Sequence, residues 1–308
     1  MTISIQDKID YPPLTVGVVT HSGSFVDFEC FLNRLIPAIA HYPASINLLI
    51  VNNSGINEAN KTAALLTKSK LNDACNARVL PSPENNIATG RNLVLTETKT
   101  KLLAFIDDDE YPTREWLTEL VKTILHHSCA AVAGPALPVF ENAAAPLWIQ
   151  NLDLHNSRGK YSGEVVTTCA TANVLIDLSQ TGEQQFISDF GRSGGEDAQY
   201  FMSLVKKGKV IRWCNEAVVY ETIPENKSTV SYILKRFMIQ GEIHKRIMEV
   251  NGDISSPILF YLRAFFLFIF ALPIGIILAL ARRQSAGSWI RRSIGNLGKL
   301  ISIQAKLY

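Results

Sequence analysis

Four consecutive acidic residues, Asp107, Asp108, Asp109 and Glu110, follow an apolar stretch at residues 101–106. Carboxylates this close together repel one another, so the run costs stability unless a positive charge lies among them. Mg²⁺ and Mn²⁺ prefer hard oxygen ligands, and they usually take one or two protein carboxylates and complete their coordination with water and diphosphate oxygens. The run therefore indicates a divalent-cation site, with a solvated strand end that caps the next helix as the alternative.

A second pair of acids, Glu196 and Asp197, follows two glycines and begins an amphipathic helical pattern. The helix dipole favours acids at a helix start, which is the simpler explanation. The catalytic explanation is that a glycine loop places a carboxylate at the mouth of a pocket, where it can accept the proton of an attacking hydroxyl. Both explanations remain open on this stretch alone.

Arg91 begins a predicted helix directly after Gly90. Backbone N–H groups at such a helix start can bind an anion together with a guanidinium group. A surface ion pair is the alternative.

Alternating patterns predict the elements that position these residues. In the first half, strands are expected at residues 15–20, 46–51, 77–81 and 101–106, with helices at 26–40, at 58–68 and after residue 90. This alternation requires right-handed crossovers and a mostly parallel sheet with helices on both faces. Because ligands gather at the carboxyl ends of such strands, Asn52, Asn53, Arg91 and the acidic run should share one edge.

The second half is less regular. A strand is expected at residues 130–139, one or two strands at 165–176, a helix at 197–207 and a strand pair at 210–221.

The composition excludes some classes of protein. The 308 residues carry a formal net charge of +2, which gives no argument for a nucleic-acid binder. The five cysteines show no C-x-x-C spacing, so a reducing cytoplasm fits better than a disulfide framework or a zinc knuckle. The N-terminal stretch has no apolar run and is unlike a secretory signal.

Six motifs occur in the order, and at about the spacings, of the inverting family 2 glycosyltransferases, which the chain resembles over about residues 14–245. They are Thr20 after the first strand, LIVNNSG at 49–55, NIATGRN at 86–92, FIDDDEYP at 105–112, ANVLI at 172–176, and GGEDAQYF with IRWCNEAVVYETIP within 194–224. Their wording resembles the bacterial subgroup that includes the succinoglycan-type β-1,4-glucosyltransferases.

The resemblance implies a GT-A fold, a Rossmann-like α/β domain that binds a nucleotide sugar, here most simply a UDP-hexose. Thr20 would lie beside the uridine, and Arg91 would lie near the base or the diphosphate. Asn52 would replace an Asp that usually reads the uracil ring, and its amide can both donate and accept hydrogen bonds.

The resemblance also gives the acids separate roles. Asp107 would face the ribose, and Asp109 would bind the Mg²⁺ or Mn²⁺ that bridges the two phosphates. Asp108 is counted with the donor site, although the side chains of Asp108 and Glu110 are expected to support the turn or to face water.

The implied reaction is an inverting transfer. Asp197 would take the proton of an acceptor hydroxyl that Glu196 helps to orient, and the hydroxyl would attack the anomeric carbon from the face opposite the diphosphate. The metal would stabilise the leaving group, and the product would be β-linked. Residues 235–241 lack the Trp of the Q-x-x-R-W motif of processive synthases, which predicts transfer of a single sugar to a glycan or lipid-linked saccharide in cell-surface or exopolysaccharide biosynthesis.

The C-terminal part predicts contact with a membrane. Residues 264–281 contain no charge, and no acid occurs after residue 253. With a cytoplasmic catalytic domain, a single crossing would export the basic tail against the positive-inside tendency. We therefore expect a segment that re-enters by breaking at residues 273–275, or one that lies in the interface, followed by a basic amphipathic tail.

These patterns predict two domains, a GT-A catalytic domain at residues 1–245 and a membrane-associated segment at 246–308, at the cytoplasmic face of a bacterial inner membrane. One alternative is a catalytically idle assembly protein, which would not need to keep its acids. Another is a different nucleotide-sugar or phosphate enzyme, such as a nucleotidyltransferase. It should carry Lys or Arg in a phosphate loop after the first strand, and residues 20–29 have neither.

Overall fold

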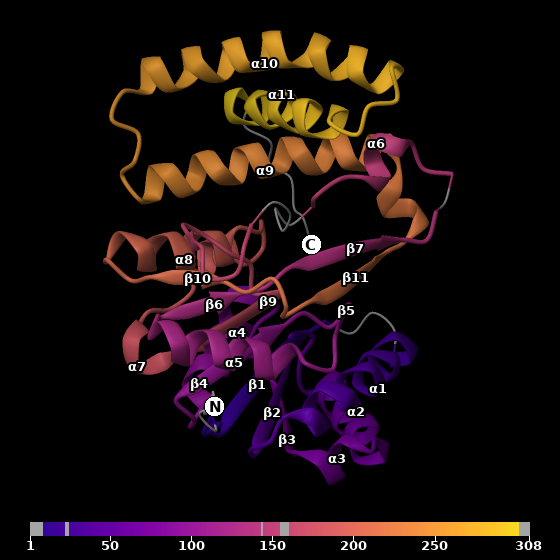
Figure 1. The fold of residues 1–308 in the computed structure, drawn as a ribbon, viewed down its shortest axis with the longest axis vertical. Coiled ribbons are helices and arrows are strands. Elements are labelled where there is room, and N and C mark those ends of the chain that lie inside the picture. Colours follow the sequence, from indigo (N-terminus) through magenta and orange to yellow (C-terminus); the bar gives the residue numbers. More distant parts are fainter. Residues whose placement is uncertain (1–8, 22–24, 143, 155–159, 302–308) are drawn as a thin grey trace, which may run out of the picture.

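The computed structural model describes residues 9–21, 25–142, 144–154 and 160–301. Its centre is an eight-stranded sheet with the order β3-β2-β1-β4-β9-β6-β10-β8 (Figure 1). These strands are β1 (Leu14–Thr20), β2 (Ile46–Asn52), β3 (Asn76–Pro81), β4 (Leu102–Ile106), β6 (Ala131–Ala133), β8 (Val165–Val166), β9 (Asn173–Asp177) and β10 (Ile211–Trp213).

The sheet is mixed. Strands β1 to β4 pair in parallel as predicted, and β10 is parallel to β6. Strand β9 runs antiparallel to both β4 and β6, and β8 is antiparallel to β10. Parallel neighbouring strands need a long crossover connection, usually a helix. The helix described between β6 and β9 has only four residues, α6 (Leu147–Gln150), which agrees with the antiparallel pairing of these strands. The prediction of a mostly parallel sheet therefore holds for the first half of the chain.

Helices cover both faces of the sheet. The longer helices of this part are α1 (Phe25–His41), α2 (Ile56–Lys68), α4 (Ile87–Glu97), α5 (Trp116–His127) and α8 (Glu196–Lys206), and the short ones are α3 (Leu71–Ala74) and α7 (Leu178–Thr181). On β2, Leu48 and Ile50 pack with α1 and α5, whereas Leu49 and Val51 pack with α4 and α8. Burial on both faces explains why the strand is a continuous apolar run.

A second, three-stranded sheet stands beside the acidic run. It has the order β5-β11-β7, with β5 (Glu110–Pro112), β7 (Ala136–Phe140) and β11 (Val219–Ile223). The central strand β11 is antiparallel to β5 and parallel to β7. The last acid of the run thus belongs to a strand.

Three helices form a layer on one side of the molecule: α9 (Val230–Val250), α10 (Pro257–Leu280) and α11 (Ala286–Leu300). Helix α11 lies between α9 and α10, and α10 is outermost (Figure 1). The backbones of α9 and α11 approach closely, because a Cβ atom on Gly241 would clash with the carbonyl oxygen of Gly295. The predicted boundary at residue 245 falls inside the continuous helix α9.

Helix α10 is continuous, so the expected break at residues 273–275 is wrong. Pro273 lies inside the helix, which ends at Leu280 and is covered along one side by α11. Packing against α11 supports the helix at Pro273, where proline cannot donate a backbone hydrogen bond. Among the described residues, α10 is the one helix long and apolar enough to cross a membrane by length and composition, with a mean hydropathy of 2.4.

Candidate active site

A cleft of about 1170 Å³ opens where β1 and β4 end. Thr20, Arg91 and residues 107–110 line one side, and Asp197 lines the cleft from the start of α8. Helix α9 adds a further wall, with Tyr232, Arg236 and Gln240 spaced by one helical turn. The predicted site residues therefore meet in one cleft, with the exception of Asn52 and Glu196, which are described below.

The four acids of the run have four different environments. Asp107 accepts a hydrogen bond from Arg91 Nη2 at 3.2 Å, and an oxygen of Asp108 accepts one from Thr20 Oγ1 at 2.5 Å. Asp109 is the most exposed of the four. Glu110 is 2% exposed and points into the protein, so the expectation that it supports the turn or faces water is wrong.

The pKa values of these acids are raised. Burial raises the pKa of Asp108 to about 7, against the hydrogen bond from Thr20. The loss of water inside the cleft raises the pKa of Asp109 to about 6, and repulsion by Asp107 and Glu221 adds to this while Lys227 opposes it. Burial also raises the pKa of Glu110 well above its ordinary value. Burial is thus the largest cause of these raised pKa values, and repulsion between the carboxylates adds to it.

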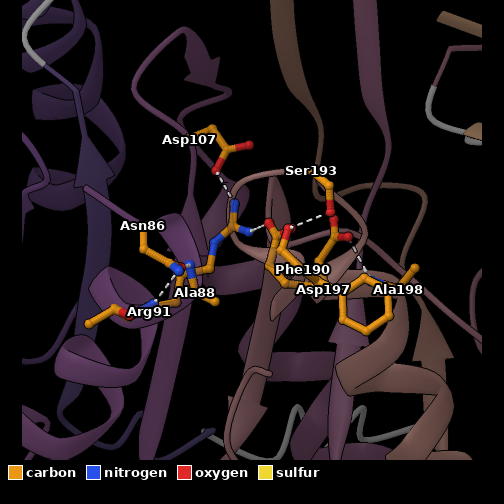
Figure 2. A network of polar contacts seen from close by, with 10 residues as sticks. Asn86, Ala88, Arg91, Asp107, Phe190, Ser193, Asp197 and Ala198 are labelled. Carbon is orange, nitrogen blue, oxygen red and sulfur yellow. Dashed lines mark hydrogen bonds and ion pairs between the residues drawn. The ribbon is translucent and has the colours of Figure 1, made fainter. Parts of the chain in front are cut away.

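Arg91 is a buried side chain that joins the acidic run to the second acid pair. Asn86 caps α4 by accepting hydrogen bonds from the backbone N–H groups of Ala88 and Thr89, and this fixes the helix turn that carries Arg91. Arg91 extends toward Asp107 beside the loop that bears Ser193 and Asp197 (Figure 2). Its Nη1 donates to Glu196, which is 1% exposed.

Glu196 and Asp197 are adjacent in the chain but differ in exposure. Burial raises the pKa of Glu196 to about 7, while the charge of Arg91 opposes this rise and that of Asp197 adds to it. Glu196 is not among the cleft-lining residues, whereas Asp197 is. An oxygen of Asp197 accepts from the backbone N–H of Ala198 at 2.6 Å. Asp197 is therefore the carboxylate that can meet a ligand, and Glu196 lies behind it, paired with Arg91.

The loop before Asp197 is held by α9. Gly195 has φ of 93° and no room for a side chain, because a Cβ there would clash with Ile243 of α9. Arg246 of the same helix donates to Ser193 Oγ at 2.7 Å, and its guanidinium carbon lies 4.8 Å from the centre of the Phe190 ring. This contact between loop and helix fixes where the helix with Asp197 begins.

Asn52 does not line the cleft. It is 1% exposed, donates to Thr62 Oγ1 at 2.9 Å and accepts from the backbone N–H of Ser54 at 2.9 Å. The next residue, Asn53, is the one from this loop that reaches the cleft. A direct contact of Asn52 with a base would require this buried side chain to become accessible, and its assignment stays a prediction.

The sequence reading did not include several cleft residues. The alternation along β11 is a signal that could have found Glu221, because it places this residue on the same face as Val219 and Ile223. Helix α9, the 3-10 turn η2 (Glu225–Ser228) and α11 are brought to the cleft by tertiary packing, which no local pattern signals. The residues concerned are Glu221, Lys227, Arg236, Gln240 and Arg291.

The donor chemistry of the cleft fits a hard divalent cation. Carboxylate oxygens line one side, and one of them, Glu110 Oε2, is buried with no hydrogen-bond partner among the described residues. Within the described part of the chain, no three carboxylate, histidine or cysteine side chains converge closely enough to hold a metal unaided. A cation would therefore need oxygens from a ligand or from water as well.

Comparisons with known proteins agree with this geometry. Residues 25–177 match the family described as glycosyl transferase family 2. Over 168 residues the chain is 33% identical to the succinoglycan biosynthesis protein ExoM of Rhizobium meliloti, a match that covers 54% of this chain and 54% of ExoM. The chain therefore matches about half the length of this curated relative.

Two solved structures share the fold. The mannosyltransferase PcManGT from Pyrobaculum calidifontis, in complex with GDP-Man and Mn²⁺, has a TM-score of 0.64 at 14% identity over 94% of this chain and 86% of its own. TarS 1–349 of S. aureus, in complex with UDP-GlcNAc, has a TM-score of 0.51 at 15% identity over 94% and 90%. At such identities the likeness concerns the fold, and it confirms the expected GT-A architecture.

Proposed function

We propose that this chain, whose residues 25–177 match glycosyl transferase family 2, is a glycosyltransferase. It moves one sugar from a nucleotide donor, most simply a UDP-sugar, to a hydroxyl of a glycan or lipid-linked saccharide. The anomeric centre is inverted and a β-linkage results. The similarity to a succinoglycan biosynthesis protein supports a product in exopolysaccharide biosynthesis. The observation that carries the proposal is the single cleft that Asp197 and the acidic run line together.

Asp197 is the general base. Its neighbour Glu196 is committed to Arg91, so Asp197 is the member of the pair that is open to the cleft. It takes the proton of the acceptor hydroxyl, which then attacks the anomeric carbon. The two glycines before α8 allow the backbone to turn tightly, and Arg246 keeps the turn in place.

The donor lies along the acidic edge. Asp107 faces the ribose and is oriented by Arg91, while Thr20 and Asp108 hold each other beside the base. Arg91 acts through Asp107 and Glu196, because its guanidinium is buried between these carboxylates. Asn53 replaces Asn52 as the residue of its loop that can contact the base.

Asp109 would hold Mg²⁺ or Mn²⁺ together with the diphosphate oxygens. When bound, the cation neutralises negative charge on the leaving diphosphate. Lys227 lines the same cleft as Asp109, where its ammonium group stabilises the same leaving group. A catalytically idle assembly protein would not need carboxylates and a lysine to line the same cleft.

The proposal is tested with the purified chain, a panel of labelled nucleotide sugars and lipid-linked saccharide acceptors. We expect transfer from one UDP-sugar that stops in chelator and returns with Mg²⁺ or Mn²⁺, and a product whose new linkage is β by NMR. Transfer that is equally fast in chelator would remove the cation from the proposal. An α-linked product would refute the inverting mechanism.

We further propose that the chain works on the cytoplasmic face of the inner membrane and that α10 lies in the plane of the bilayer surface. Its outward side is apolar, with Leu259 at 66%, Phe270 at 65% and Ile277 at 64% exposure. Its inward side packs on α11, which carries Arg291, Arg292 and Lys299, so α10 cannot cross the bilayer without that charged partner. The basic residues of the layer suit anionic lipid.

The double substitution Phe266→Glu with Phe270→Glu is expected to weaken binding to vesicles containing phosphatidylglycerol by at least about 10-fold, because two aromatic side chains no longer enter the apolar layer. Flotation on a density gradient measures the bound fraction. The matched control is Leu125→Glu with Val139→Glu, two apolar residues exposed elsewhere on the surface. Equal flotation of both double variants would contradict the assignment of this face.

A further inference from the structure

Two glutamates meet across the second sheet beside the acidic run. Glu110 of β5 is the register partner of Glu221 of β11, so their side chains lie on the same face of the antiparallel pair. They are 2% and 6% exposed, and both line the cleft. The neighbouring partners Tyr111 and Tyr220 stack on the opposite face with ring centres 5.4 Å apart, which fixes this register.

Glu110 is unusual among the acids of the cleft. Its Oε2 is buried and has no hydrogen-bond partner among the described residues, and in that part of the chain no lysine or arginine forms a salt bridge with it. Two carboxylates side by side with little water are unfavourable in the protein alone. The β ladder holds them together nevertheless, which indicates that something positive is to be placed between them.

We propose that Glu110 and Glu221 belong to the cation site, so that the divalent cation is held between the β4–β5 turn and β11 and not by the turn alone. This inference rests on the proposed use of a cation in sugar transfer. Asp109 supplies the carboxylate from the turn, and Glu221 supplies one from the opposite strand. Glu110, deeper in the cleft, accepts a hydrogen bond from water bound to the cation, so that two protein carboxylates and not three would bind the cation directly.

The chemistry of the ligands supports this placement. Mg²⁺ and Mn²⁺ take carboxylate oxygens in small number and leave the other positions to diphosphate and water. No three such side chains converge closely enough in the described chain to bind a cation unaided. The site is therefore expected to close when a nucleoside diphosphate supplies the missing oxygens, which couples cation binding to donor binding.

The experiment compares Glu110→Gln and Glu221→Gln with Glu225→Gln, which removes one charge from an exposed glutamate of the adjacent turn η2. UDP binding is measured by calorimetry at a series of Mn²⁺ concentrations. For both site variants, the Mn²⁺ concentration that gives half-maximal UDP affinity should rise by about 10- to 100-fold. Glu225→Gln should behave as the natural chain.

Thermal unfolding gives a second readout that does not depend on activity. Of the two site variants, Glu110→Gln should unfold in chelator at the same or a higher temperature than the natural chain, because a buried carboxylate whose Oε2 has no hydrogen-bond partner among the described residues is replaced by a neutral amide. When Mn²⁺ and UDP are added, the unfolding temperature of both site variants should rise by less than that of the natural chain. A residue with a merely structural role would lower the unfolding temperature in both conditions.

Asp109→Ala separates this inference from the proposed function. If Asp109→Ala abolishes the Mn²⁺ dependence of UDP binding while both glutamine variants keep the natural dependence, the inference about Glu110 and Glu221 is overturned and the proposed cation is not. If none of these variants changes that dependence, the cation itself is wrongly assigned. Should Glu110→Gln fail to fold, Glu221→Gln carries the same test.

Discussion

Asp197→Asn is expected to lower kcat by about 10³-fold, within the range that a positioned general base contributes. The amide has the same shape but cannot take the proton of the acceptor hydroxyl. Asp197 is the carboxylate of the second pair that opens to the cleft, so no neighbouring acid can replace it there. Initial rates at saturating donor and acceptor measure the effect.

The affinity for UDP in the presence of Mn²⁺ should stay within about twofold of the natural value, because Asp197 lies on α8 and not on the donor edge. Asp189→Asn is the matched control, since it removes a carboxylate from an exposed position on the same loop. A kcat that falls by less than about tenfold in Asp197→Asn would show that another group accepts the proton.

Arg91→Met is expected to destabilise the fold by about 3–5 kcal/mol, the usual loss when one partner of a buried ion pair is removed. Arg91 and Glu196 are 2% and 1% exposed, so the substitution leaves the Glu196 carboxylate without its counter-charge inside the protein. Urea unfolding followed by tryptophan fluorescence measures the change.

The double substitution Arg91→Met with Glu196→Gln should recover part of the loss, because the uncompensated charge is then gone. Arg78→Met is the control. Arg78 pairs with Glu97 at 3.4 Å on the surface, and its loss is expected to cost no more than about 1 kcal/mol. If Arg91→Met and Arg78→Met have equal effects, the Arg91 pair does not stabilise the fold as the burial implies.

The first half of the chain was predictable because three of its strands, β1, β2 and β4, are buried on both faces. Residues 46–51 were expected as a strand and β2 spans Ile46–Asn52, and residues 101–106 were expected where β4 spans Leu102–Ile106. Such strands read as continuous apolar runs in the sequence, and turn residues mark their ends. The shared edge of Thr20, Arg91 and the acidic run followed from the parallel order of these strands.

The errors arose where tertiary contacts decide the outcome. Pro273 suggested a break, yet packing on α11 keeps α10 continuous. Glu110 was expected to support a turn or face water, but pairing of β5 with β11 turns it inward. Asn52 and Asn53 both follow the second strand in the sequence, and the structure separates them because Asn53 lines the cleft and Asn52 does not.

The continuity of α9 also limits how the protein can be shortened. One side of this helix contributes Arg236 to the cleft, and its Arg246 holds the loop before Asp197. The other side packs on α11, which brings Arg291 to the same cleft. A truncation placed before α10 to gain solubility would therefore remove α11 and with it Arg291 from the cleft. Purification in detergent or lipid, which covers the outer side of α10, would keep α11 and the cleft intact.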